Sequence, residues 1–549
     1  MKAKFLAITM ATFALLATTA PSNAAVWSAP EIPFSDNETI GVQIVDNYSA
    51  TGEQVSTLKA RPYASLMSGG FMAEENLCTS VGVAPCDKSD QAYFATLILP
   101  ACVSQTDQWC IESMGVRKKG EPLKNAAFIR QIDAGTVPDT PGDGIPGGST
   151  VSLWRAEGMN NSGGADTYAT YVMIRAQKDP GRPFFFSDFS AMVLPYSEKR
   201  GFQYERGSAR EGVNPFGVRG VQTLGTAAGC AWTETGLCGV LEDFPKDSRV
   251  SMTLRMSNQL TGWLMGRMAD PTIEVEQFTT EQNRIRIDAE PVAVPKFYAT
   301  AKKSQVTPAM LQSLGGRLDF GSTQNTQANY SSSFDLIEAW KDIAGDKAAG
   351  VVTTWSASTV KYGFGSQCLA DTTKLLGVVT TNAMVYDGSA PAFENGTLNY
   401  RVGGMHYEPD GKTEFQGTYD LVKRKSTAQC LYGFTDAPIT ATITVVEAGK
   451  EQRIETSSLQ ELGSGADKWL KLSARGFTFS SPTLKIKLNQ DKPVVAPPAP
   501  SQSTTSQSAS SAPAVKAPAK RISITCVKGK VTRKVSGVAP KCPAGFKKR

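Results

Sequence analysis

The chain has 549 residues, of which 41% are hydrophobic and 20% are charged, and it contains a single histidine. These proportions are typical of globular proteins, so they exclude a wholly disordered chain and a membrane protein with many spans. One histidine in the whole chain excludes most histidine-based catalytic and metal sites. At about 100–200 residues per domain, the length predicts several domains.

Residues 1–24 have the features of a secretory signal peptide. Two lysines precede an apolar run over 5–17, and Ser22 and Ala24 are small residues that suit signal-peptidase cleavage. The run is shorter than the ~20 residues of a membrane-spanning helix, which disfavours the alternative of an N-terminal anchor. The mature chain is therefore expected to begin at Ala25 outside the cytoplasm, with no transmembrane segment after cleavage.

Ten cysteines fall mostly in close pairs, which favours disulfides in an exported chain. Ten cysteines allow roughly 900 pairings, so the set below is an inference from spacing and elimination. The alternatives are free thiols or a zinc site, and zinc would want a Cys-x2–4-Cys spacing that is absent. Chain entropy predicts about 2.5 kcal/mol for an eight-residue loop and about 4 kcal/mol for the longest loop. The expected pairs are Cys78 with Cys86, Cys102 with Cys110, Cys230 with Cys238, Cys526 with Cys542 and, by elimination, Cys368 with Cys430.

Charge is spread unevenly along the chain. The formal net charge is +6, but residues 516–549 hold eleven Lys or Arg and no acid, whereas 25–515 hold 44 basic and 51 acidic residues. The mildly acidic body has no basic stripe interleaved with aromatic residues, so nucleic acid is not an expected partner. The basic tail is the candidate contact with an anionic partner.

Apolar and polar residues alternate with period two through most of the body, which is typical of strands with one buried face. The fold class predicted from this is mainly β, with two antiparallel β-sandwich-like domains and few short helices. Helices are expected only at 306–314 and at 334–343, where Gly345 is the stop signal. The expected strands are 39–45, 92–99, 150–155, 168–175, 184–194, 250–256, 285–287, 398–402, 419–422, 439–446, 477–479 and 484–488.

The chain is expected to divide into five segments. Residues 493–520 contain no aromatic or acidic residue and are rich in Pro, Ser and Ala, so they predict an extended linker without a core. The basic unit after the linker is too short for a large core and would need its disulfide. The segments are a signal peptide at 1–24, an N-terminal β-rich domain at 25–300, a second β-sandwich-like domain at 301–491, the linker at 492–520 and a basic, disulfide-stapled C-terminal unit at 521–549.

Two stretches of the last unit, 524–530 (ITCVKGK) and 540–548 (PKCPAGFKK), resemble the C-terminal tail of exported actinobacterial proteins. That tail also follows a Ser/Pro/Ala linker in those proteins. Residues 419–422, 430–434 and 476–482 are similar to the body domain of the same group. The resemblance implies an exported location and no catalytic residue.

His406 follows the expected strand at 398–402 and precedes a Pro-Asp-Gly turn. A lone histidine in this setting is expected to be a hydrogen-bonded loop residue and not a general base. The chain has no Gly-x-Ser-x-Gly elbow, P-loop or His-Glu-x-x-His motif. No catalytic residue, metal or cofactor is therefore predicted.

Glu157 and Asp166 flank a Gly-rich loop beside Trp154 and Tyr168. Paired carboxylates with aromatic rings nearby would suit an enzyme that acts on a glycan. An ordinary hairpin loop is the favoured alternative.

Asp133, Asp139 and Asp143 lie in a Pro/Gly-rich stretch that would offer oxygen ligands to calcium. Their spacing departs from the Asp-x-Asp-x-Asp-Gly pattern of calcium loops. An ordinary loop is again favoured.

The basic side chains of the terminal unit are the predicted contacts with an anionic polymer of the cell envelope. A teichoic-type polymer or an anionic lipid surface would attract them, and added salt would weaken the attraction. The alternative is that these charges only keep the unit soluble. The residues are Lys528, Lys530, Arg533, Lys534, Lys541, Lys547, Lys548 and Arg549.

Taken together, the sequence predicts a secreted, envelope-associated binding or surface-display protein without an evident catalytic site. The sequence leaves open whether the body binds a glycan or a protein ligand. The alternatives are an extracellular carbohydrate-active enzyme that uses paired carboxylates and a structural component of a surface coat.

Overall fold

The computed structural model divides into two compact units, residues 1–492 and 493–549. The expected signal peptide and linker lie outside the described residues. These are 30, 32, 36–46, 55–64, 74–132, 137–140, 144–201, 208–213, 219–224, 230, 232–260, 262–318, 321, 323–360, 367–369, 374–433, 439–447, 450–454, 459–463, 468–479, 483–490, 522–528, 531–537, 541–542 and 546–548.

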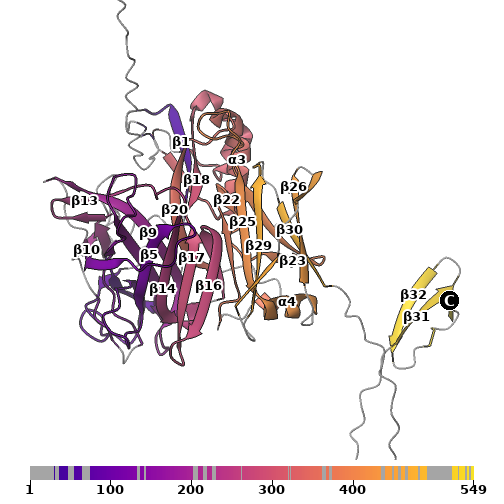
Figure 1. The fold of residues 1–549 in the computed structure, drawn as a ribbon, viewed down its shortest axis with the longest axis horizontal. Coiled ribbons are helices and arrows are strands. Elements are labelled where there is room, and N and C mark those ends of the chain that lie inside the picture. The colour runs from indigo at the N-terminus through magenta and orange to yellow at the C-terminus, as the bar shows by residue number, and fades with distance from the viewer. Residues whose placement is uncertain are drawn as a thin grey trace, which may run out of the picture. The chain divides into compact units, whose positions relative to one another are not determined.

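The first unit is mainly β, which confirms the predicted fold class (Figure 1). Eighteen strands join into one large branched sheet. Most neighbouring strands are antiparallel, and the β1–β19 and β15–β21 pairs are parallel. The strands of the large sheet are β1 (Thr39–Val45), β2 (Thr57–Pro62), β3 (Asn76–Leu77), β4 (Gln91–Ile98), β6 (Ala127–Gln131), β7 (Ser152–Arg155), β8 (Thr167–Lys178), β9 (Phe185–Arg200), β12 (Trp232–Glu234), β13 (Leu237–Leu241), β15 (Trp263–Arg267), β18 (Val292–Lys302), β19 (Thr323–Gln327), β20 (Gly350–Val360), β21 (Gly377–Thr381), β25 (Gly417–Arg424), β28 (Gln460–Leu462) and β29 (Trp469–Phe477).

Three smaller sheets complete the first unit. A four-stranded sheet contains β5 (Cys110–Lys118), β14 (Ser248–Ser257), β16 (Ala269–Gln277) and β17 (Gln282–Glu290). A six-stranded sheet contains β22 (Val385–Tyr386), β23 (Ala392–Glu394), β24 (Thr397–Gly403), β26 (Ile439–Glu447), β27 (Lys450–Ile454) and β30 (Thr483–Gln490). A hairpin is formed by β10 (Ser208–Val213) and β11 (Arg219–Leu224).

The first sandwich packs the four-stranded sheet, in the order β16-β17-β14-β5, against β4, β8 and β9 of the large sheet. Alternate residues of β14 from Val250 to Met256 are buried in this core, as the predicted alternation requires. They share one apolar cluster with Leu97, Val172 and Val193. The other face of β14 therefore points away from the core.

The second sandwich packs the six-stranded sheet against β21, β25 and β29. Leu421 and Leu472 of the large sheet share a core with Tyr400 and Leu484 of the six-stranded sheet. The predicted strand at 477–479 is wrong in its position, because β29 ends at Phe477 and the next two residues pair with no strand. Phe479 is nonetheless fully buried, so the apolar alternation there reports burial in the core and not strand pairing.

The two sandwiches share the large sheet, so the chain folds across the expected boundary at 300. That boundary falls within β18. β1, near the N-terminus, pairs with β18 and β19 and places Ile40 and Val42 in the second core. A segment from the start of the chain thus completes a core whose other buried members all lie at residue 263 or later.

Both predicted helices are present. α2 (Pro308–Ser313) begins with a proline in its first turn, and α3 (Ser331–Ala344) ends at Gly345, which adopts φ 67°. Trp340 of α3 is fully buried in the second core. The other described helical segments are α4 (Lys425–Tyr432) and the 3-10 turns η2 (Asn258–Leu260), η3 (Lys303–Gln305) and η4 (Gln367–Leu369). None of the helices in the described part has the length and apolar character needed to cross a bilayer.

All ten cysteines form disulfides, in the pairs expected from spacing. Three bonds close loops of sequence separation 8 in the N-terminal half. The Cys368–Cys430 bond spans a separation of 62 and joins η4 to α4. The bonds therefore brace turns locally and fix one long connection in the second half.

The second unit contains a three-stranded antiparallel sheet. β31 (Ile522–Lys528) lies between β32 (Val531–Gly537) and β33 (Lys547–Lys548). Cys526 is fully buried and bonds to Cys542, sixteen residues later. The disulfide joins the central strand to the segment that leads into β33.

Candidate functional site: the charged face and the basic terminal unit

His406 is held by its neighbours and not presented to a substrate. Its side chain is 24% exposed, its Nδ1 lies 3.3 Å from the Phe479 carbonyl oxygen and its Nε2 lies 3.6 Å from Glu414 Oε1. Its backbone N–H donates to Asp346 Oδ1 at 3.0 Å. The structure therefore places His406 in a hydrogen-bonded loop.

The loop between β7 and β8 does not present its aromatic rings to a ligand. Trp154 is buried and its Nε1–H donates to Thr170 Oγ1 at 2.8 Å. Tyr168 is fully buried and its hydroxyl donates to the Met159 carbonyl at 2.7 Å. Both rings lie inside the first core, so they are not placed to stack on a sugar, which disfavours the glycan-enzyme alternative at this loop.

The two carboxylates of that loop each face a cation. Glu157 Oε2 lies 3.1 Å from Lys124 Nζ, and Asp166 Oδ1 lies 3.8 Å from Arg155 Nε. The Glu157 pair is largely exposed, so it contributes little to stability. This arrangement is an ordinary polar hairpin loop.

Of the three candidate calcium ligands, Asp133 and Asp143 lie outside the described residues. Asp139 is described and exposed. Among the described side chains, no three of the types His, Cys, Asp and Glu come together as a metal site.

The strand register of the terminal unit brings basic positions together across β31. Arg533 of β32 and Lys548 of β33 lie on either side of Cys526, and Lys547 is opposite Val527. Neighbouring strands are about 4.8 Å apart, so the two positions that flank Cys526 are separated by roughly twice that distance. The register thus brings three basic sequence positions onto neighbouring strands.

Three of the predicted polymer contacts have described side chains, and all three are exposed. The side chains of Lys528, Arg533 and Lys534 and the whole of Lys530 and Arg549 lie outside the description. The exposed residues are Lys541, Lys547 and Lys548.

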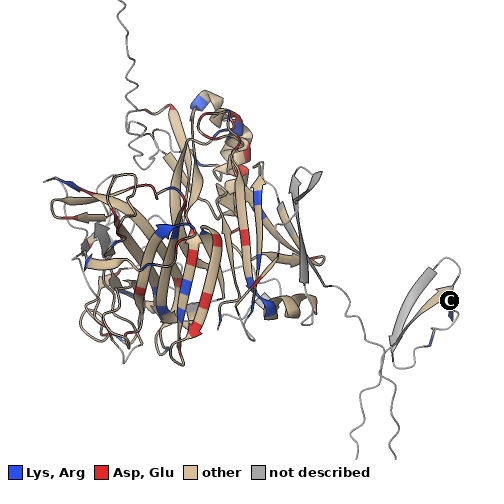
Figure 2. Ribbon diagram, viewed as in Figure 1, with Lys and Arg blue, Asp and Glu red and all other residues tan. Residues whose placement is uncertain are grey.

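The outer face of the four-stranded sheet, called the charged face below, carries ion pairs in rows across its strands. Figure 2 shows acidic positions on β16 beside basic positions on β17. One row runs from Thr253 through Arg286 to Glu274, and the next runs from Arg255 through Arg284 to Glu276. The sequence prediction does not include this face, although Glu-x-Glu at 274–276 and Arg-x-Arg at 284–286 are a signal for it. Opposite charges on neighbouring strands stabilise such a face.

Glu112 is the shared acceptor at one end of these rows. It is the extra residue of β5 at a break in the β5–β14 register. It accepts from Arg255 Nε at 2.8 Å and from Arg284 Nη2 at 2.6 Å. Burial alone would raise the pKa of Glu112, but the hydrogen bonds from the two arginines hold it below its usual value.

Arg255 ties the sheet to the Cys102–Cys110 loop. Its side chain is only 3% exposed. Its Nη1 donates to three carbonyl oxygens of that loop, those of Ser104, Gln105 and Asp107, at 2.9–3.1 Å. The loop is therefore held by a guanidinium group as well as by its disulfide.

Asp270 joins the charged face to the second sandwich. It adopts φ 52° on β16 and pairs with Arg249 of β14 and with Lys471 of β29. Burial opposes its ionisation, but the ion pairs with Lys471 and Arg249 hold the pKa of Asp270 below its usual value. Its backbone N–H donates to Asp420 Oδ2 at 2.9 Å.

Asp420, on β25, has a fully buried carboxylate that is satisfied on every side. Arg475 Nη2 lies 2.7 Å from Oδ1 and 2.8 Å from Oδ2, and the Thr380 hydroxyl donates to Oδ2 at 3.2 Å. The Ser473 hydroxyl also donates to Oδ1. Asp420 therefore accepts hydrogen bonds from residues of both sandwiches at their junction.

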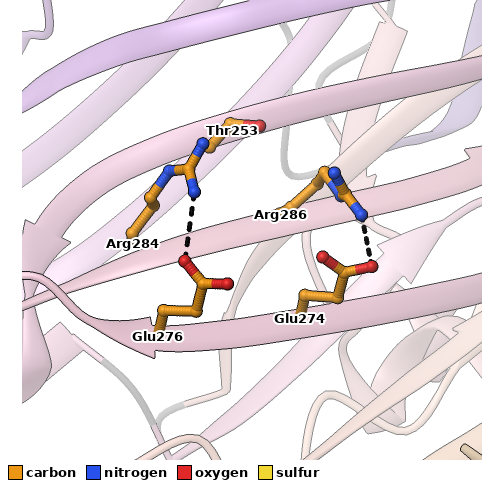
Figure 3. A pocket seen from close by; sticks show the side chains of 5 residues that line it. All are labelled: Thr253, Glu274, Glu276, Arg284 and Arg286. Carbon is orange, nitrogen blue, oxygen red and sulfur yellow. Dashed lines mark hydrogen bonds and ion pairs between the residues drawn. The ribbon is translucent and has the colours of Figure 1, made fainter. Parts of the chain in front are cut away.

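A shallow depression lies on the charged face between the two outer Arg–Glu pairs (Figure 3). Arg284 Nη1 donates to Glu276 Oε2 at 3.0 Å, and Arg286 Nη2 donates to Glu274 Oε1. Thr253 completes the lining. The depression has room for about one water molecule, so this face suits contact with a chain or a surface more than enclosure of a small molecule.

Lys423, three residues along β25 from Asp420, is the exception to this pattern of paired charges. It is fully buried, and its Nζ has no hydrogen-bond partner among the described residues. The amine lies 5.2 Å from the centre of the Tyr432 ring. Burial lowers the pKa of Lys423 to about 7.

No family model, no curated protein and no solved structure matches this chain. Function is therefore inferred from its own residues.

Proposed function

We propose that this is an exported, cell-envelope-associated binding or surface-display protein, and that its basic terminal unit tethers the body to anionic envelope polymer. The single observation that carries the proposal is the segregation of charge. The chain places eleven basic residues and no acid at 516–549, and its compact terminal unit lies beyond residue 492. Exposed lysines on such a unit attract polyanions, and the attraction weakens as salt is added.

Three further features support the proposal. The five disulfides suit an oxidising compartment, where such bonds persist. The tail resembles those of exported actinobacterial proteins, and the leader has the features of a signal peptide. The Pro/Ser/Ala composition of 493–520 suits a spacer between the body and the tethering unit.

Deletion of 521–549 is expected to release the protein from cells into the medium. The reason is that the deletion removes the cationic unit and leaves the whole disulfide-braced body in place. Immunoblotting of the cell and medium fractions measures the ratio of released to cell-bound protein. A smaller release is expected when only the three exposed lysines are changed, as Lys541→Gln, Lys547→Gln and Lys548→Gln.

A matched control changes three exposed lysines of the body, Lys88→Gln, Lys118→Gln and Lys412→Gln. This variant loses the same charge, so it distinguishes a tethering unit from a general effect of net charge. The proposal fails if the deleted chain stays on the cells, or if the control is released as readily as the tail variant.

A further inference from the structure

β16 is an edge strand of the four-stranded sheet, and along half of its outer edge it pairs with no strand in the part of the chain that the structure describes. Its first half contacts the second sandwich through the hydrogen bond from Asp270 to Asp420. Over 273–277, no other strand of the described residues pairs with its outer edge. An edge of this kind presents unpaired N–H and C=O groups to solvent.

The opposite edge of the same sheet is covered. The Ala126 N–H donates to the Met114 carbonyl at 2.8 Å, and Arg117 Nε donates to the Glu121 carbonyl at 3.0 Å. The segment between Glu121 and Ala126 therefore runs along β5. Of the two edges of this sheet, the β16 edge over 273–277 is the one that the described residues leave unpaired.

Two glutamates stand beside the open edge with binding capacity to spare. Glu274 and Glu276 are 55% and 62% exposed. Each uses one carboxylate oxygen for an arginine of β17, and the other oxygen accepts no hydrogen bond from the described residues (Figure 3). A carboxylate can accept from donors on two sides, so each glutamate can serve a second strand.

β17 shows which partner these glutamates select. Arg284 and Arg286 stand two residues apart, so both project from the same face of β17 and lie opposite Glu276 and Glu274. A strand added to the other edge of β16 would lie at a similar distance of about 4.8 Å. Basic residues with the same spacing on that strand would meet the unused carboxylate oxygens.

A second copy of the chain does not fit this edge. If two β16 strands paired antiparallel about Val275, Glu274 of one copy would lie opposite Glu276 of the other. Like charges that are directly opposed destabilise strand pairing. The same glutamates that would attract a basic strand therefore repel self-association.

We infer that the open edge of β16 over 273–277 binds an extended peptide segment of another protein in which two Lys or Arg residues stand two positions apart. Main-chain hydrogen bonds supply affinity in such strand addition, and the alternating side chains supply selectivity. Five residues of extended chain span about 17 Å, so a short segment suffices. This site is independent of the basic terminal unit.

The test uses the full mature protein and a fluorescent peptide that copies residues 282–290, which carries the Arg-x-Arg spacing of β17. Fluorescence anisotropy measures binding, and hydrogen exchange measures protection of the amides at 273–277. Saturable binding with slowed exchange there is expected. The double variant Glu274→Gln and Glu276→Gln is expected to bind about tenfold more weakly, because two cross-strand ion pairs are lost.

Two controls make the outcome decisive. The control peptide has the same composition, but its two arginines are adjacent. It is expected to bind the wild-type protein about tenfold more weakly than the Arg-x-Arg peptide does. The variant Glu157→Gln, which removes an exposed glutamate on another loop, is expected to bind like the wild type. The proposal would be overturned if the two peptides bound the wild-type protein equally well, or if the Arg-x-Arg peptide bound the wild type and the double variant equally well. It would also be overturned if the protected amides lay elsewhere than at 273–277.

Discussion

The variant Asp420→Ala is expected to lower the free energy of unfolding by about 3 kcal/mol, because it removes a buried carboxylate and leaves its hydrogen-bond donors unpaired. The carboxylate is fully buried and accepts from Arg475, Thr380, Ser473 and the Asp270 backbone. Alanine leaves these donors without their acceptor at the junction of the two sandwiches. Guanidinium denaturation of the mature protein, followed by tryptophan fluorescence, measures the loss.

The variant Asp420→Asn separates the charge from the shape of the side chain. Asparagine keeps one acceptor oxygen, so a smaller loss than that of the alanine variant is expected. Asp335 of α3 is exposed, and Asp335→Ala is expected to change stability by no more than about 0.5 kcal/mol. Equal stability of Asp420→Ala and Asp335→Ala would show that the junction does not depend on this carboxylate.

The variant Lys423→Met is expected to make the protein about 4 kcal/mol more stable at pH 7, because methionine fills a similar volume without a buried amine. Burial lowers the pKa of Lys423 to about 7 in the folded protein, whereas an ordinary lysine has a pKa of 10.5. Between these values the unfolded chain binds the proton and the folded chain releases it, so stability rises with pH. The loss of stability caused by the buried Lys423 amine is therefore largest below pH 7 and disappears as the pH approaches 10.5.

The measurement is the difference in unfolding free energy between wild type and Lys423→Met at several pH values. That difference is expected to narrow from about 4 kcal/mol at pH 7 to about 2 kcal/mol at pH 9. The control Lys468→Met changes a half-exposed lysine that is paired with Glu461, and its difference from wild type is expected to stay nearly constant. Parallel curves for wild type and Lys423→Met would contradict the account of this buried amine.

Strands in which apolar and polar residue types alternate could be predicted from the sequence. β1 and β14 were predicted in this way, close to their observed bounds, although the polar residues of β14 from Ser251 to Ser257 are buried too. β15 (WLMGR) and β21 (GVVTT) were not predicted, because their residue types do not alternate in this way. Strands buried on both faces often lose the alternation that identifies them.

The candidate site was harder to predict because its contacts are distant in the sequence. Glu112 meets Arg255 and Arg284 across separations of 143 and 172 residues. The two charged motifs at 274–276 and 284–286 are visible in the sequence, but their alignment depends on the β16–β17 register. The joining of the two sandwiches through Asp420 also depends on which strands become neighbours.

Lys423 illustrates a signal that the sequence does carry. It lies two and four residues after Leu421 and Tyr419, so period two places it on the face that points into the second core. A lysine on a buried face is unusual and indicates a perturbed group. Only the structure shows that the amine has no hydrogen-bond partner among the described residues.

The central claim is that the basic terminal unit holds the protein to anionic envelope polymer. Equilibrium binding of the mature chain to immobilised poly(glycerol phosphate), compared with a chain that ends at residue 520, tests it most directly. The full chain is expected to bind at about 0.01 M salt and to lose most of its affinity at about 1 M, where the screening length falls from about 30 Å to about 3 Å. Equal binding by the two chains, or binding that salt does not change, would contradict the claim.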